Sequence, residues 1–168
     1  TLRPLKISDV DDFLEYAGDA NVTRFTRWSG FTSKEEAVSC IKEFCIPHPF
    51  CRSICINDHS IGFLMITPQS GDGKCGAILG YALAAAYWGQ GIVPRALRMA
   101  ISEGFKEFPH VVRLEAVIEV ENKASQKVLD KIGFYKERIL RKYTFNKGQV
   151  KDLVMYSLLS TDPICLDS

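Results

Sequence analysis

The feature that most constrains this chain is the stretch from Ile78 to Leu97, where an apolar run meets two closely spaced glycines and then an amphipathic segment. The run that ends at Leu83 fits a strand covered on both faces. From Val93 onward the apolar residues recur at helical spacing, and Pro94 is tolerated in a first helical turn, where no intrahelical acceptor exists for its N–H. The stretch predicts a strand, a tight turn and a helix that opens at Pro94.

The turn itself predicts a phosphate site. Gly89 and Gly91 leave the first N–H groups of the helix free, with the positive end of the helix dipole behind them. A Walker loop is excluded because Ile92 and Val93 follow Gly91 in place of Lys-Ser/Thr. The dinucleotide fingerprint is excluded because Pro94 stands where its third glycine belongs. A plain strand-to-helix connection remains the alternative.

Length and charge limit the function classes. A chain of 168 residues with a net charge of +1 fits one domain, which we expect over residues 1–160, with a loosely ordered tail at 161–168. The charge argues against a nucleic-acid partner, because such proteins concentrate basic residues. No apolar run is long enough to span a membrane, so we expect no membrane partner.

Cysteine and histidine spacing argues against a metal site. None of the cysteines forms a C-x-x-C pair, and the histidines are scattered. We expect reduced thiols, a cytoplasmic protein and no metal. The six cysteines are Cys40, Cys45, Cys51, Cys55, Cys75 and Cys165.

Periodicity and turn residues predict the order β-α-α-β-β-β-α-β-α-β-β. Capping boxes at Ser8/Asp11 and Ser33/Glu36 mark the first two helices, and Gly133 ends the last one. The expected strands cover residues 2–7, 51–56, 61–66, 78–83, 111–117, 140–145 and 150–158, and the expected helices cover 8–17, 33–45, 94–107 and 122–132.

Two motifs resemble those of the GNAT acyltransferases, especially the branch of ribosomal-protein (alanine) N-acetyltransferases. Residues 87–93, Tyr-Trp-Gly-Gln-Gly-Ile-Val, resemble the pyrophosphate loop Gln/Arg-x-x-Gly-x-Gly/Ala, departing from it at Trp88 and Val93. Residues 122–134 resemble the second hallmark, Asn-x-x-Ala/Ser-x-x-Val/Leu-x-x-x-x-Gly-Phe. The two motifs and the strand between them span the central third of the chain.

The resemblance implies a fold and a coenzyme. The fold would be α/β (α+β), with a mixed, mostly antiparallel sheet of six to seven strands and about four helices on its faces. The coenzyme would be acetyl-CoA, lying where the strand before Trp88 and the strand before Glu119 separate. The residues implied for binding are Leu83, Ala84, Trp88, Gly89, Gln90, Gly91, Ile92, Val93, Asn122 and Ser125.

The resemblance also suggests catalytic residues. Many members carry a tyrosine that protonates the leaving thiolate, but Leu129 stands at that position here, so Ser125 is the expected acid. Glu115 is our candidate base, because a carboxylate within an apolar strand is costly unless it is paired or used. Glu119 and Glu121 are alternatives, and each of these residues has an ordinary structural explanation.

The sequence therefore predicts an N-acetyltransferase that moves acetyl from acetyl-CoA to a primary amine in a ternary complex. The amine could be a protein N-terminus or a small molecule. Three residues before the second helix could shape the groove that binds this acceptor: Arg24, Arg27 and Trp28. We expect a monomer or weak homodimer. The alternative is a non-catalytic acyl-CoA-binding sensor or interaction module on the same fold.

Overall fold

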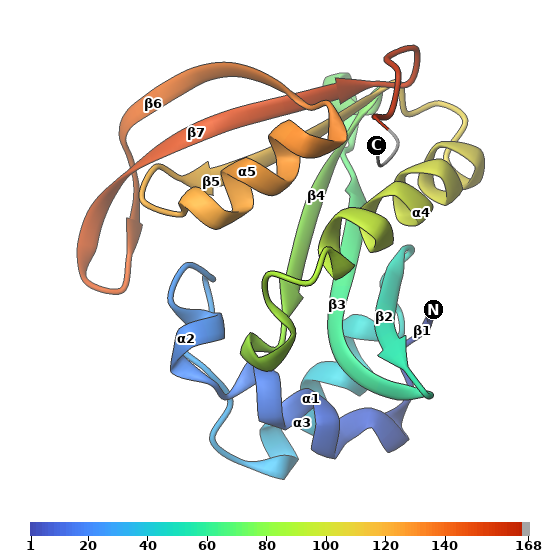
Figure 1. Cartoon of the computed structure of the whole chain (residues 1–168), viewed down its shortest axis with the longest axis vertical. Coiled ribbons are helices and arrows are strands. Elements are labelled where there is room, and N and C mark those ends of the chain that lie inside the picture. Colours follow the sequence, from blue (N-terminus) through green and yellow to red (C-terminus); the bar gives the residue numbers. More distant parts are fainter. Residues whose placement is uncertain (166–168) are drawn as a thin grey trace.

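A computed structural model describes residues 1–165 and contains one seven-stranded sheet in the order β1-β2-β3-β4-β5-β7-β6 (Figure 1). Every neighbouring pair is antiparallel except β4 and β5, which are parallel. The strands are β1 (Leu2–Pro4), β2 (Cys51–Ile56), β3 (His59–Pro68), β4 (Gly76–Leu83), β5 (Arg113–Glu119), β6 (Tyr135–Asn146) and β7 (Gln149–Leu159). The helices are α1 (Val10–Ala17), α2 (Ala20–Thr23), α3 (Lys34–Cys40), α4 (Ile92–Glu107) and α5 (Lys123–Ile132), and a π-helical turn (Ile41–Cys45) extends α3.

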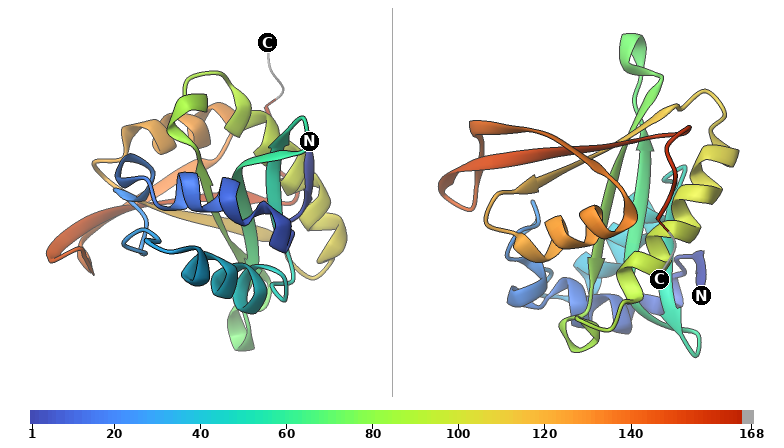
Figure 2. Two further views of the ribbon diagram at one scale, coloured as in Figure 1. Left: turned by 90° about the horizontal axis from the view of Figure 1, so that it is seen from below. Right: turned by 45° about the horizontal axis from the view of Figure 1, so that its top comes forward.

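Helices cover both faces of the sheet, with α4 and α5 on one side and α1 and α3 on the other (Figure 2). Leu97 and Ile101 of α4 and Leu129 of α5 are fully buried in the larger core cluster. Phe13 of α1 and Ile41 at the end of α3 are buried in the second cluster. Apolar residues at helical spacing thus anchor each helix to its own sheet face.

The sheet divides between β4 and β5. The two strands pair only from Gly76/Arg113 to Ile78/Glu115, although β4 continues to Leu83 and β5 to Glu119. Figure 1 shows β4 running downward and β5 running to the left from this shared start. Beyond the last pair, each strand presents unpaired backbone groups to the other, so the divergence is a place where a ligand could bind.

The predicted element order and mixed sheet are confirmed, with differences in several elements. Strand β1 ends at Pro4 rather than Ile7, and β5 covers Arg113–Glu119 rather than 111–117. The helix predicted to open at Pro94 begins at Ile92, so the proline is its third residue, where its missing N–H still lacks an intrahelical acceptor. A short helix, α2, lies between the first two predicted helices. Strand β6 begins at Tyr135 rather than Leu140.

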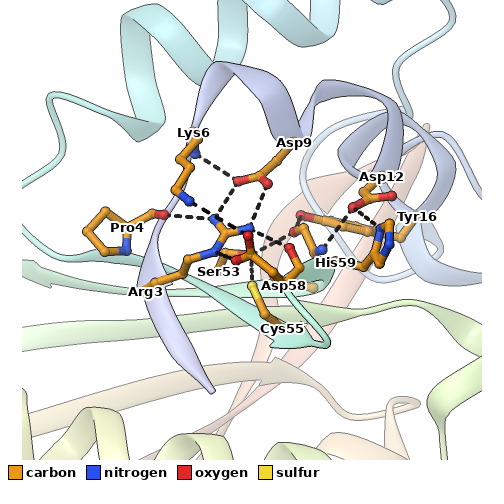
Figure 3. A network of polar contacts seen from close by, with 12 residues as sticks. Arg3, Pro4, Lys6, Asp9, Asp12, Tyr16, Ser53, Cys55, Asp58 and His59 are labelled. Carbon is orange, nitrogen blue, oxygen red and sulfur yellow. Dashed lines mark hydrogen bonds and ion pairs between the residues drawn. The ribbon is translucent and has the colours of Figure 1, made fainter.

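The predicted Ser8/Asp11 capping box is wrong. The chain enters α1 through a 3₁₀ turn at Ile7–Asp9, and Asp9 accepts the Lys6 N–H at 2.8 Å. Asp9 also accepts two hydrogen bonds from Arg3, both at 2.8 Å, and Arg3 reaches Asp58 in the β2–β3 turn (Figure 3). Burial alone would raise the pKa of Asp9, but Arg3 and the Lys6 amide outweigh it and hold that pKa below its usual value.

The predicted loose tail is held in place as far as Cys165. The N–H of Cys165 donates to the Ile132 carbonyl at 2.9 Å, and Arg98 Nε donates to the Cys165 carbonyl at 2.6 Å. The rest of the predicted tail, residues 166–168, lies outside the described residues. Within residues 1–165 no helix is both long and apolar enough to cross a membrane.

Candidate functional site

The loop between β4 and α4 exposes a row of backbone donors. Gly89 and Gly91 have φ of +75° and +73°, a region that costs other residues about 1–2 kcal/mol. In the described chain, the N–H groups from Gly89 to Val93 donate to no protein acceptor, and the N-cap Gly91 offers no side chain to satisfy them. Pro94 follows without an N–H. These donors, at the positive end of a 16-residue helix, form an anion-binding arrangement.

Trp88 connects this loop to the open edge of β4. Its indole N–H donates to the Leu83 carbonyl at 2.8 Å, while the ring remains 50% exposed. The N–H of Ala84 donates toward β3, to Ile61 at 2.8 Å. Because backbone groups along a strand alternate between its two edges, the groups of Leu83 face the side where β5 has separated. Of the predicted coenzyme residues at this strand end, Leu83 therefore faces the divergence, whereas the N–H of Ala84 faces β3.

The second motif begins α5 on the other side of the divergence. Asn122 is its N-cap and accepts the Ser125 N–H through Oδ1 at 3.2 Å, leaving the amide NH₂ unused. The Ser125 hydroxyl makes no hydrogen bond to another described residue, which removes the back-bonded explanation for this serine. Leu129, one helical turn further, is fully buried.

Tyr81 is a site residue that sequence reasoning missed. It projects from β4 toward the first turn of α5, where its hydroxyl donates to the Ser125 carbonyl at 3.5 Å. Burial raises the pKa of Tyr81 to about 12, so the hydroxyl keeps its proton near neutral pH. This hydrogen bond connects β4 to the first turn of α5 across the divergence. A tyrosine in an apolar strand resembles any core tyrosine, so the sequence carried no signal for this role.

Glu115 takes part in an ion-pair network with Arg113 and Glu137. Its carboxylate accepts from Arg113 Nε at 2.8 Å, and Arg113 also binds Glu137 at 2.7 Å. Ser157 donates to the same Glu137 carboxylate at 2.6 Å. Glu115 is the last residue of β5 that pairs with β4, so it stands at the closed end of the divergence and is half-buried rather than buried in the core.

Glu119, at the open end, occupies a different environment. It is the last residue of β5 and is 7% exposed, and Asn146 from the β6–β7 hairpin donates to it at 2.6 Å. It lines a pocket of about 260 Å³. The lining residues are Arg24, Phe25, Glu119, Glu121, Asn146, Lys147, Gln149 and Lys151. A larger hollow of about 670 Å³ lies along β6 and contains none of the predicted site residues.

The structure thus gathers most of the predicted residues around one divergence. The donors of the loop after β4 lie at one side, Asn122 and Ser125 at the other, and Glu119 at the end of β5. Glu115 is separated from them by its position at the closed end. Among residues 1–165, no group of three or more His, Cys, Asp or Glu side chains could hold a metal ion.

Comparison with known proteins agrees with this geometry. The family described as acetyltransferase (GNAT) domain matches residues 1–135. The uncharacterized N-acetyltransferase p20 of Bacillus licheniformis is 31% identical over 96% of this chain and 93% of its own length. The fold also matches Mycobacterium smegmatis RimJ in complex with CoA-disulfide, with a TM-score of 0.79, 23% identity and coverage of 95% and 81% of the two chains. The ribosomal-protein-alanine N-acetyltransferase from Brucella melitensis matches with a TM-score of 0.77, 20% identity and coverage of 95% and 99%. The chain therefore belongs to the GNAT family and is an acetyl-CoA-dependent acetyltransferase.

Proposed function

We propose that this acetyltransferase acetylates a primary amine by direct attack on acetyl-CoA in a ternary complex. The observation that carries the proposal is the row of unpaired N–H groups from Gly89 to Val93, beside a strand divergence that ends in a pocket containing Glu119. The donors suit the pyrophosphate of a coenzyme, and the pocket offers a carboxylate to an incoming amine.

Coenzyme binding would use the backbone more than side chains. The pyrophosphate would accept from the amides of residues 89–93, with Trp88 and Gln90 flanking it. The pantetheine arm would extend along the end of β4 at Leu83 and Ala84, where the Leu83 N–H faces the divergence while its carbonyl binds Trp88. The unused amide NH₂ of Asn122 would donate to the arm from the α5 side.

We propose Glu119 as the general base in preference to Glu115. Its buried carboxylate lines the pocket, with Asn146 at 2.6 Å and Lys151 at 3.9 Å, whereas Glu115 lies outside the pocket in a shorter ion pair with Arg113, at 2.8 Å. The lone pair of the neutral amine attacks the thioester carbonyl carbon, and Glu119 takes the amine proton directly or through one water. Collapse of the tetrahedral intermediate breaks the C–S bond and leaves an amide and a thiolate.

Ser125 would pass a proton from solvent water to that thiolate, so that its hydroxyl regains the proton that it gives. Its hydroxyl is half-exposed and makes no protein hydrogen bond, so it is available to the coenzyme sulfur. Tyr81 would hold the first turn of α5 at the correct separation from β4 through the Ser125 carbonyl. Positioning of the two substrates supplies a large part of the acceleration in such a mechanism.

The test is release of coenzyme A, followed with a thiol reagent over a panel of primary amines, with mass spectrometry of the products. We expect stoichiometric thiol release and a mass increase of one acetyl group on at least one amine. Binding of acetyl-CoA without turnover on any amine would instead support the non-catalytic sensor. An acetylated hydroxyl or thiol product, with unmodified amines, would also contradict the proposal.

A further inference from the structure

The acceptor pocket is closed on one side by the β6–β7 hairpin. Lys147 Nζ, at the hairpin tip, donates to the Thr23 carbonyl at the end of α2, and Asn146 donates to the Thr26 carbonyl at 3.4 Å. Partial burial lowers the pKa of Lys147, and Glu119 opposes that shift. The resulting volume of about 260 Å³ is below the roughly 300–1,000 Å³ typical of sites for drug-sized ligands. The pocket therefore suits a small molecule.

One side of the pocket carries the two carboxylates. Glu119 is buried there, and Glu121 is exposed at the rim, where Lys151 binds it at 3.2 Å. Lys151 also lies 3.9 Å from Glu119, and Lys147 interacts electrostatically with Glu119. This side therefore holds two carboxylates and two lysines, and the buried Glu119 carboxylate is the acceptor that it offers to an amine N–H.

The other side of the pocket carries a cation without a carboxylate partner. Arg24 is exposed, and its guanidinium Cζ lies 5.0 Å from the centre of the Phe25 ring. In the part of the chain that the structure describes, no carboxylate lies within ion-pair distance of Arg24. Its planar set of N–H donors suits a carboxylate or another planar anion. Of the other two cations that line the pocket, Lys147 binds the Thr23 carbonyl and Lys151 binds Glu121.

We propose that the acceptor is a small amine that also bears an anionic group, as an amino acid does, with its amine at Glu119 and its anion at Arg24. This inference rests on the proposed N-acetyltransferase function and specifies its substrate class. The alternative acceptors for the same chemistry are uncharged amines and the N-termini of polypeptides, for which an unpaired cation at the pocket wall has no partner.

The experiment compares free L-amino acids with their carboxamides, which keep the amine and lose the carboxylate. Rates are compared at equal concentrations of the neutral amine, because the two classes differ in amine pKa. We expect kcat/KM to be at least about tenfold higher for the best amino acid than for its carboxamide, the factor expected for one charge-assisted hydrogen bond. In Arg24→Gln this preference should fall below about threefold, because kcat/KM should fall more for the amino acid than for its carboxamide.

Two further variants distinguish recognition of the carboxylate by Arg24 from a general effect of positive surface charge. Arg24→Lys should retain part of the preference, whereas Lys136→Gln, which removes an exposed cation on β6 outside the pocket, should retain all of it. Equal rates for acid and carboxamide, or faster acetylation of neutral peptides, would overturn the inference and leave the proposed function intact. Equal losses on both substrate classes in Arg24→Gln would overturn it as well. Failure of the proposed function is distinct, since no amine would then be acetylated.

Discussion

Gly91→Asp should weaken acetyl-CoA binding without unfolding the protein. Gly91 has φ of +73° and ψ of 8°, and a Cβ built on it meets nothing within 4 Å, so a side chain fits but projects into the space before the free donors. An added carboxylate about 5 Å from two pyrophosphate charges in this exposed loop costs about 2–3 kcal/mol at an effective dielectric constant of 40–80. The dissociation constant should therefore rise roughly 30- to 150-fold.

Gly71→Asp provides the matched control. Gly71 has φ of +64°, also has open space where a Cβ would stand, and lies in the turn before β4. Both variants bear similar left-handed strain, so thermal unfolding should change by similar amounts. Calorimetry should show weakened acetyl-CoA binding only in Gly91→Asp. Unchanged affinity in a folded Gly91→Asp protein, or equal weakening in both, would refute the assignment of the anion site.

Four further predictions address catalysis, stability and redox state. Ser125→Ala should lower turnover about 10²-fold at unchanged acetyl-CoA affinity, measured by single-turnover kinetics and calorimetry; a changed affinity alone would make it a binding residue. Glu119→Gln should lower turnover at least as much, while Glu115→Gln should affect turnover little; the reverse order would restore Glu115 as the base. Asp9→Asn should lower the free energy of unfolding by about 1–3 kcal/mol at pH 7. Because the pKa of Asp9 is lowered in the folded state, its contribution is present above about pH 4 and is lost as the pH falls through the folded value, so urea titrations at pH 3 should show a smaller difference. Alkylation of the denatured, non-reduced protein should label six thiols by mass spectrometry, and a lower number would contradict the expectation of reduced cysteines.

The coenzyme loop could be predicted from sequence because its physics is local. Glycines at positions 89 and 91 indicate a turn with positive φ, and the helical periodicity from Val93 indicates the helix whose N-terminus forms the anion site. The Asn122 cap and the Gly133 stop are likewise local signals, and both are confirmed. Periodicity placed α4 two residues late because Pro94 is acceptable anywhere in the first turn.

The remaining features depend on contacts between distant segments. Glu119 and Glu115 are four residues apart on one strand, and their environments differ because β4 and β5 separate between them and because Asn146 of the β6–β7 hairpin reaches only Glu119. Tyr81 reaches Ser125 from 44 residues away. The first part of β6 lacked a clear pattern because it is an edge strand exposed along most of its length, with two register irregularities and a positive φ at Lys142.

The central claim, that the coenzyme pyrophosphate lies on the start of α4, is tested most directly by amide NMR. Coenzyme A and pantetheine, which lacks the pyrophosphate, would each be titrated into the labelled protein. We predict that coenzyme A shifts the amide resonances of Gly89, Gly91 and Ile92 strongly, whereas pantetheine shifts residues of β4 near Leu83 and leaves the loop nearly unchanged. Saturable binding of coenzyme A that leaves the loop amides unshifted would contradict the claim.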